Sequence, residues 1–389
     1  MTRILTLTAL CALAASPTLA GGWETGKLDT SFLYEDGNYV ELSYGSLDYS
    51  LNAEIDSGVV RNMAKDQSRL AVSGKITVGN LEIGLTSFDS GAIQMDGQAA
   101  AADVTTCYTN AGQLAAAASG SAAQATALAD MKTNCSLVPT ADINLDTDAV
   151  VARYKVNEQF SVIGGIRKIN LAPSTVSTLK TNYTINGSSG SGLIYGFSYE
   201  VPQIALKAEV VRSEAKKLSA SGFALGGLTQ GATLPLSDSS VSVPESLTLK
   251  FQTGIAENTL LMASAHKVKW GSAQIVANVA GDALDVTSSF EDTTSYSLGL
   301  GRKLNDNTSA SLSYSWEDGS GSTSTSPFTM SNGSKTLSVG LKHRLEAVTL
   351  SGGVSYTKVG DVTASSGGLS AVYAGNSVTA FGLKVGYNF

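Results

Sequence analysis

The chain has 389 residues, a formal net charge of −7, 15% charged residues and 40 glycines. The acidic balance argues against nucleic acid as a partner, because such a partner requires an excess of Lys and Arg. After residue 20 no uninterrupted apolar run reaches the roughly 20 residues that a transmembrane helix needs. A secreted globular enzyme is compatible with this composition, but a barrel with a polar lumen and an apolar outer face explains it better.

The first 20 residues have the pattern of a secretory signal peptide. Arg3 supplies a positive charge, Ile4 to Ala15 form an apolar core, and Thr18-Leu19-Ala20 precede the expected cleavage before Gly21. Cleavage would leave residues 21–37 as a short N-terminal periplasmic or plug segment.

From residue 38 to the end, apolar and polar residues alternate in fourteen segments, the period of strands with two different faces. Turns of two or three residues follow the even-numbered segments, and long connections rich in Gly, Ser and Thr follow the odd-numbered ones. Short periplasmic turns and long external loops are typical of bacterial barrels. We therefore predict an all-β, 14-stranded antiparallel transmembrane β-barrel over residues 38–389. The expected segments are 38–55, 69–79, 81–96, 145–157, 159–171, 191–201, 204–215, 243–256, 259–278, 293–305, 308–316, 335–345, 348–362 and 376–389.

The third connection, residues 97–144, is predicted to be an Ala-rich external loop. Ten residues of Ala111–Asp130 are Ala, interrupted by Ser119-Gly120-Ser121, which favours two short helices or a helical hairpin. A flexible, solvated loop is the alternative. Cys107 and Cys135 bracket the segment, and an isolated pair in an oxidising compartment is most simply a disulfide, with two unpaired thiols as the alternative.

The C-terminal segment shows the alternation most clearly. Its second face is small or polar, and its first face carries Phe381, Leu383, Val385, Tyr387 and Phe389. A last strand of this kind is expected to close a barrel against the first strand and to anchor at the membrane interface.

Charged strand residues are expected to face the lumen, because a charge at the lipid midplane costs roughly 2–4 kcal/mol. By parity the lumen holds more Lys and Arg than Glu, which would attract a carboxylate. Arg167 is the first candidate for substrate binding, because it lies in the outer half of its strand. The further candidates are Arg153, Lys155, Lys250 and Lys384. For each of them, pairing across strands is the simpler alternative.

Enzymatic and metal-binding functions find little support in the sequence. The two histidines, His266 and His343, are expected at the membrane interface, and no hydrolase triad can be assigned to them. The run Asp142-x-Asn144-x-Asp146 begins like a calcium loop, but its sixth position is Thr147 instead of Gly. No catalytic residue, metal site or cofactor is expected.

The chain resembles the long-chain fatty-acid transporter (FadL) family of outer-membrane proteins. The run Glu35-Asp36-Gly37-Asn38-Tyr39-Val40-Glu41-Leu42 is similar to the family's passage into strand one. Val243-Pro244-Glu245-Ser246 is similar to the Leu-Pro-Glu start of strand eight, and Lys269-Trp270 to the Trp-containing end of the following strand. Strand number, helical insertion and aromatic terminus agree as well, so the resemblance covers nearly all of the chain after the signal peptide.

The resemblance implies external capture of hydrophobic molecules, passage past an N-terminal plug and lateral exit beside a kinked third strand. The kink would fall at Asp89-Ser90-Gly91, since Gly is expected where a strand bulges. An ordinary flexible approach to the long loop is the alternative. The family's Asn-Pro-Ala motif is missing before strand one, so the plug is expected to be shortened or absent.

These observations predict a non-enzymatic protein of the bacterial outer membrane that passively transports hydrophobic compounds, most specifically long-chain fatty acids. A porin-like channel for small polar solutes and a surface or adhesion protein are the alternatives. The expected partners are a hydrophobic small molecule such as a fatty acid, outer-membrane lipid and lipopolysaccharide, and the barrel-assembly machinery during biogenesis.

Overall fold

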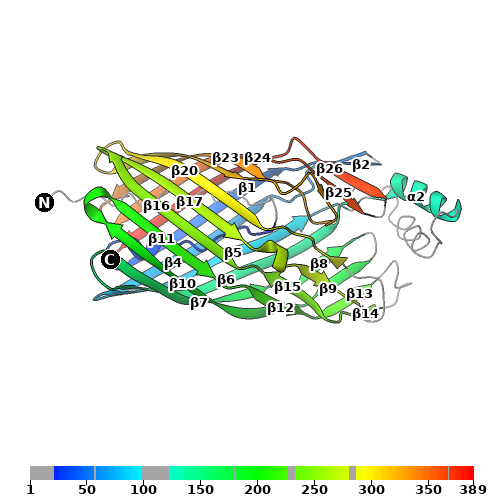
Figure 1. Cartoon of the computed structure of the whole chain (residues 1–389), viewed down its shortest axis with the longest axis horizontal. Helices are drawn as coiled ribbons and strands as arrows, with labels where there is room; N and C mark the ends of the chain where they lie inside the picture. Colours follow the sequence, from blue (N-terminus) through cyan, green and yellow to red (C-terminus); the bar gives the residue numbers. More distant parts are fainter. Residues whose placement is uncertain are drawn as a thin grey trace.

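The computed structural model describes residues 22–56, 58–97, 122–135, 137–178, 181–225, 233–279, 286–366 and 368–389. Fourteen strands form a closed antiparallel barrel, as predicted (Figure 1). They are β1 (Tyr39–Ser50), β4 (Gln67–Val78), β5 (Leu81–Met95), β6 (Thr140–Lys155), β7 (Phe160–Leu171), β10 (Ser188–Val201), β11 (Leu206–Ser213), β16 (Ser246–Ala256), β17 (Thr259–Val268), β20 (Thr293–Lys303), β21 (Thr308–Glu317), β23 (Ser334–Leu345), β24 (Val348–Val359) and β27 (Ser377–Asn388). The predicted signal peptide lies outside the described residues.

The C-terminal strand closes the barrel. β27 pairs with β24 on one side and with β1 on the other, where Tyr39 lies opposite Asn388. Its apolar residues point outward, and the side chains of Phe381 and Phe389 are 41% and 64% exposed. The same alternation gives all barrel strands except β11 and β17 exposed large apolar side chains on the outer face, so the barrel presents an apolar belt. None of the helices in the described residues is long and apolar enough to cross a membrane.

Three predicted segments differ from the observed barrel strands by more than three residues at one end. The segment 259–278 is broken after β17 by the 3₁₀-helix η6 (Trp270–Ser272), and the following β18 (Ile275–Ala277) joins a different sheet. The segment 38–55 divides likewise into β1 and β2 (Ala53–Ile55). β6 begins at Thr140, five residues earlier than expected, so the Ala-rich loop is shorter than 97–144.

The long connections fold into small sheets of their own. One sheet contains β12 (Lys216–Ala220), β15 (Ser239–Val243), β18 and β19 (Val286–Thr287). Another contains β22 (Thr323–Ser324), β25 (Val362–Ser366), β26 (Leu369–Tyr373), β2 and β3 (Gly58–Val60). The wall is extended by β8 (Ser174–Ser177), β9 (Asn182–Ile185), β13 (Gly222–Leu225) and β14 (Thr233–Pro235). The two small sheets and these wall strands together enclose an apolar core that includes Met63, Met95, Ile143 and Tyr183.

The Ala-rich loop contains α2 (Ala122–Asn134), at the end of the barrel opposite the C-terminus (Figure 1). This helix agrees with the helical expectation for the second half of the loop, while residues 98–121 lie outside the described part. Cys135 directly follows α2 and is buried. Cys107 is outside the described residues, so the Cys107–Cys135 disulfide stays a prediction.

Residues 22–37 lie inside the barrel. The segment contains the 3₁₀-helix η2 (Ser31–Tyr34), in which Phe32 and Leu33 are fully buried. These two side chains belong to one apolar cluster with lumen-facing residues of β6, β7, β10 and β11, namely Val151, Ile163, Ile194 and Val211. The plug was expected to be either shortened or absent. A short plug occupies the lumen, so the expectation that it is absent is wrong.

Candidate functional site

The wall of the barrel is interrupted between β4 and β5. Their pairing ends at Ala71 and Phe88. The two chain segments meet again further toward the external loops, where the Lys65 amide donates a hydrogen bond to the Gln94 carbonyl at 3.2 Å. Between these two points the edges of β4 and β5 are not paired, and we call this opening the β4–β5 window.

A β-bulge in β5 lies at the window. The register between β5 and β6 shifts between Asp89 and Gly91, so that Ser90 is the additional residue. A bulge bends its strand and exchanges the faces to which the following side chains point. Accordingly Glu82 faces the lumen before the bulge, and Ile93 is the buried residue after it. The residues Asp89-Ser90-Gly91 thus lie at the interruption of the wall.

The N-terminal segment runs along the inner side of the window. The Thr25 amide donates to the Ser90 carbonyl at 3.1 Å, and the Ala92 amide donates to the Trp23 carbonyl at 3.0 Å. From the opposite edge the Arg69 guanidinium donates to the Thr25 carbonyl. The plug therefore satisfies backbone groups that the bulge leaves without a neighbouring strand.

A cavity of about 150 Å³ at this point is lined by residues of both sides of the wall. Asp29, Arg69 and Lys384 line it from the lumen, while Leu70 and Phe381 line it from the outer, apolar face. A molecule that occupied this cavity would contact the plug and the membrane-facing surface together.

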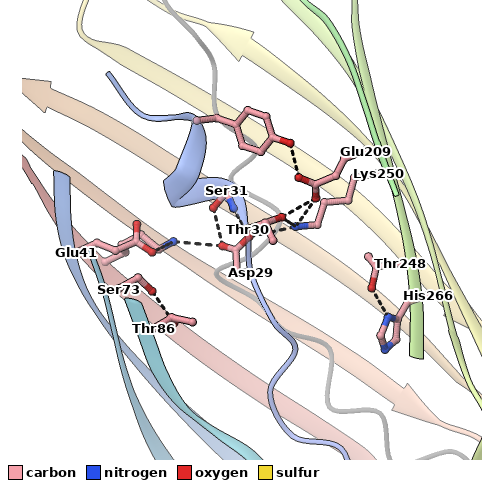
Figure 2. A network of polar contacts seen from close by, with 12 residues as sticks. Asp29, Thr30, Ser31, Glu41, Ser73, Thr86, Glu209, Thr248, Lys250 and His266 are labelled. Carbon is pink, nitrogen blue, oxygen red and sulfur yellow. Dashed lines mark hydrogen bonds and ion pairs between the residues drawn. The ribbon is translucent and has the colours of Figure 1, made fainter. Parts of the chain in front are cut away.

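Polar contacts hold the plug to the lumen wall (Figure 2). The Asp29 carboxylate lies 3.2 Å from Lys250 Nζ and 3.6 Å from Lys384 Nζ. The Thr30 hydroxyl donates to Glu209 at 2.6 Å. Burial alone would raise the pKa of Asp29, but Lys250 and Lys384 outweigh it and hold that pKa below its ordinary value. The plug is thus attached through a charged aspartate.

The lumen places four of the five predicted substrate-binding cations in ion pairs. Arg153 lies 3.0 Å from Glu82 and also contacts Glu200, and Lys155 lies 3.0 Å from Glu82. Lys250 and Lys384 bind the plug as described above. For these four residues the alternative interpretation, pairing of charges within the wall, describes the observed geometry.

Arg167 differs from them. Its guanidinium donates to the carbonyl oxygens of Glu214 at 2.6 Å and Pro244 at 3.5 Å. Within the described residues no carboxylate lies within ion-pair distance of it. It lines a small lumen cavity of about 40 Å³ together with Trp23 and Trp270, whose ring centroids are 6.3 Å apart. A cation beside two indole rings can bind an amphipathic anion.

Sequence reasoning misplaced His266. It was expected at the interface, but it is 5% exposed and faces the lumen. Its imidazole nitrogens lie 2.9 Å from Glu24 of the plug and 2.8 Å from Thr248 Oγ1. The prediction was wrong because both faces of β17 carry small and apolar residues, so that alternation gave no signal there.

Solved structures of similar fold include a FadL homologue and two toluene transporters. A Pseudomonas aeruginosa FadL homologue matches with a TM-score of 0.68 at 12% identity, over 92% of this chain and 92% of that one. The Pseudomonas putida toluene transporter TodX matches with 0.62 at 13% identity, over 97% and 98%. The Ralstonia pickettii toluene transporter TbuX matches with 0.61 at 11% identity, over 92% and 90%.

No protein-family model matches the chain, and a search of curated proteins found no match. At identities of this size the structural likeness establishes the fold. The chain has the FadL-type fold, and its closed barrel with an apolar belt is a structure of the bacterial outer membrane.

Proposed function

We propose that this protein lets hydrophobic compounds cross the outer membrane passively and leave the barrel sideways through the β4–β5 window. The observation that carries the proposal is the interruption of pairing between Phe88 and Gln94, because an open strand edge inside a membrane needs a compensating reason. The solved structures of this fold include two toluene transporters and a FadL homologue, which supports a hydrophobic cargo.

The lining of the barrel supports such a path. The external half has an apolar core, and the lumen continues with an apolar strip that includes Val151, Ile163 and Ile194. An apolar molecule would remain in contact with apolar side chains from the external end to the plug. From there the cavity behind Leu70 and Phe381 leads toward the membrane. No energy source is required, because burial in lipid favours release.

Long-chain fatty acids are our more specific proposal for the cargo. Arg167 is a lumen cation whose hydrogen bonds go to backbone carbonyls instead of carboxylates, and it lines a cavity with Trp23 and Trp270. An acid with an apolar tail would satisfy both the guanidinium and the indole rings. A neutral hydrocarbon such as toluene would use the rings alone.

A porin-like channel for polar solutes is disfavoured. The plug fills the lumen with the buried side chains of Phe32 and Leu33, and most lumen charges are paired. A polar solute would have to displace the apolar plug side chains and also break the ion pairs of the lumen.

Uptake tests this function. Cells that lack hydrophobic-compound transporters are given this protein, and uptake of labelled long-chain fatty acid and labelled toluene is measured. We expect the wild-type protein to restore uptake of at least one of them. Deleting Ser90 removes the bulge, lets β4 and β5 pair further and should return uptake to the background level. Deletion of Ser320, in an exposed external connection, is the matched control and should leave uptake unchanged.

Outer-membrane amounts of the deletion variants are compared by immunoblotting of isolated membranes. Normal uptake by the Ser90 deletion at normal membrane levels would show that the window is not the exit. If the wild-type protein transports neither compound, the proposal that it transports hydrophobic compounds is wrong.

A further inference from the structure

An apolar groove of about 640 Å³ lies on the outer face of the barrel, across β11, β16, β17 and β20. Its small lining residues are Ala208 on one side of Phe251 and Ala263 and Ala265 on the other side, and the ring of Trp316 lies beyond them. The side chain of Phe251 is 39% exposed, as expected for a lipid-facing position. The groove is therefore open to the membrane.

The width of this groove suits a single hydrocarbon chain. Ala208 lies beside Phe251, and Phe251 lies beside Ala263 in the next strand. Neighbouring strands are about 4.8 Å apart, so each alanine leaves a furrow of roughly one strand spacing between larger side chains. On the far side Tyr296 and Trp316 stack with centroids 5.5 Å apart and form a rigid wall.

Lysine side chains stand at the external end of the same outer surface. Lys335 of β23 lies directly opposite Lys358 of β24, and Trp316 lies opposite Lys335 on its other side. Lys267 stands two residues beyond Ala265 on the outer face of β17. All three lysines are exposed. In the part of the chain that the structure describes, none of them is within ion-pair distance of a carboxylate.

Two like charges directly opposite each other in a sheet repel, so the pair of Lys335 and Lys358 is unfavourable without a counter-ion. Both residues lie at the strand ends that lead into external loops, away from the short turn at Glu346. At this depth the available anions are phosphate groups of lipids in the outer leaflet. The arrangement is local, since the corresponding external part of β1 carries an exposed acidic residue, Asp48.

We propose that this surface binds one molecule of lipopolysaccharide, with an acyl chain in the alanine groove and its phosphates on the lysines. β17 and β23 are three strand spacings apart, roughly 14 Å, so Lys267 and the Lys335–Lys358 pair can each meet a phosphate of a diphosphorylated disaccharide. The β4–β5 window opens in another sector of the barrel, so this lipid would leave the proposed exit unobstructed.

Binding of purified diphosphoryl lipid A to the purified full-length protein in detergent micelles tests the proposal, with native mass spectrometry as the readout. We expect the wild-type protein to retain lipid A and to lose it when the phosphates are removed enzymatically. The double variant Lys335→Gln/Lys358→Gln should bind diphosphoryl lipid A roughly thirtyfold more weakly, since each interfacial cation contributes about 1 kcal/mol toward anionic lipid. Dephosphorylated lipid A should not distinguish this variant from the wild type.

Two matched controls separate this site from general lipid contact. Arg302→Gln removes a cation of the outer face at the opposite, short-turn end, and it should bind lipid A like the wild type. Ala265→Phe fills the groove and should weaken binding, whereas Ala310→Phe adds the same bulk outside the groove and should not. Equal binding by the lysine double variant and the wild type, or an equal loss with Arg302→Gln, would overturn the proposal.

Discussion

Substitution of Arg167 should affect the uptake of acidic cargo more than the uptake of neutral cargo. Arg167→Gln removes the cation beside Trp23 and Trp270 while keeping hydrogen-bond donors for the Glu214 carbonyl. We expect uptake of a labelled long-chain fatty acid to fall roughly tenfold at low concentration. This is the loss of affinity that corresponds to the free energy of one hydrogen bond to a charged group. Uptake of toluene should change little. Both are measured in the same cells as the initial rate against external concentration.

Arg167→Lys is the matched variant, because it keeps the charge but loses the planar fork. It should retain most fatty-acid uptake. Equal losses for fatty acid and toluene in Arg167→Gln would instead assign Arg167 a structural role in holding the Glu214 and Pro244 carbonyls.

At the scale of residues, parity along a strand predicts which face a side chain occupies but not its partner. It placed Arg153 and Lys250 in the lumen correctly. Their partners Glu82 and Asp29 depend on strand register and on the path of the plug, which no local pattern contains. For the same reason His266, whose partner Glu24 lies on the plug, was misplaced.

At the scale of elements, the contact between β5 and η2 depends on a missing side chain. A Cβ added at Gly84 would lie 2.4 Å from the Phe32 ring and 2.7 Å from Leu33. Gly84→Val should therefore push η2 away from the wall, with overpacking that costs roughly 1–3 kcal/mol. We expect a lower thermal unfolding temperature and an increased ion current through single channels.

Gly164→Val is the control for this substitution, because nothing lies within 4 Å of a Cβ added on the outer face there. It introduces the same side chain into a neighbouring barrel sector and should change neither quantity. An unchanged current in Gly84→Val, with the unfolding temperature lowered, would show that displacing η2 does not open the lumen.

The elements themselves differ in how far sequence could predict them. The barrel strands were found because a long run of strict alternation is a strong signal. The kink at Asp89-Ser90-Gly91 was implied by the family resemblance, with Gly as the residue expected at a bulge. The loop sheets were missed because strands such as β18 and β19 have only three and two residues. Their pairing is set by distant chain segments and by the common apolar core.

At the scale of the molecule, the plug fills the lumen of the barrel. Its position follows from contacts with β5, β16, β17 and β27, which lie far apart in the chain, so the sequence could not show whether the lumen was filled. A filled lumen predicts a small steady ion current in planar bilayers, in contrast to the large current of an open porin. A large wild-type current would favour the polar-pore alternative.

The attachment of the plug should also resist acid. Lys250 and Lys384 hold the pKa of Asp29 below its ordinary value against the effect of burial, so the proton binds less readily in the folded protein. The ion pairs are then fully present above the ordinary aspartate pKa and are lost only as pH falls through the lowered one. Between pH 7 and pH 5 we therefore expect the closed-state current to remain unchanged.

Asp29→Asn removes this attachment at every pH and leaves Lys250 and Lys384 to repel each other across the plug. We expect a several-fold larger single-channel current than in the wild type, already at pH 7. Asp48→Asn, an equal charge change on β1 at an exposed position, should behave as the wild type. If Asp29→Asn conducts no better than Asp48→Asn, the plug is held chiefly by the apolar packing of Phe32 and Leu33, and cargo would have to displace that packing instead of the ion pairs.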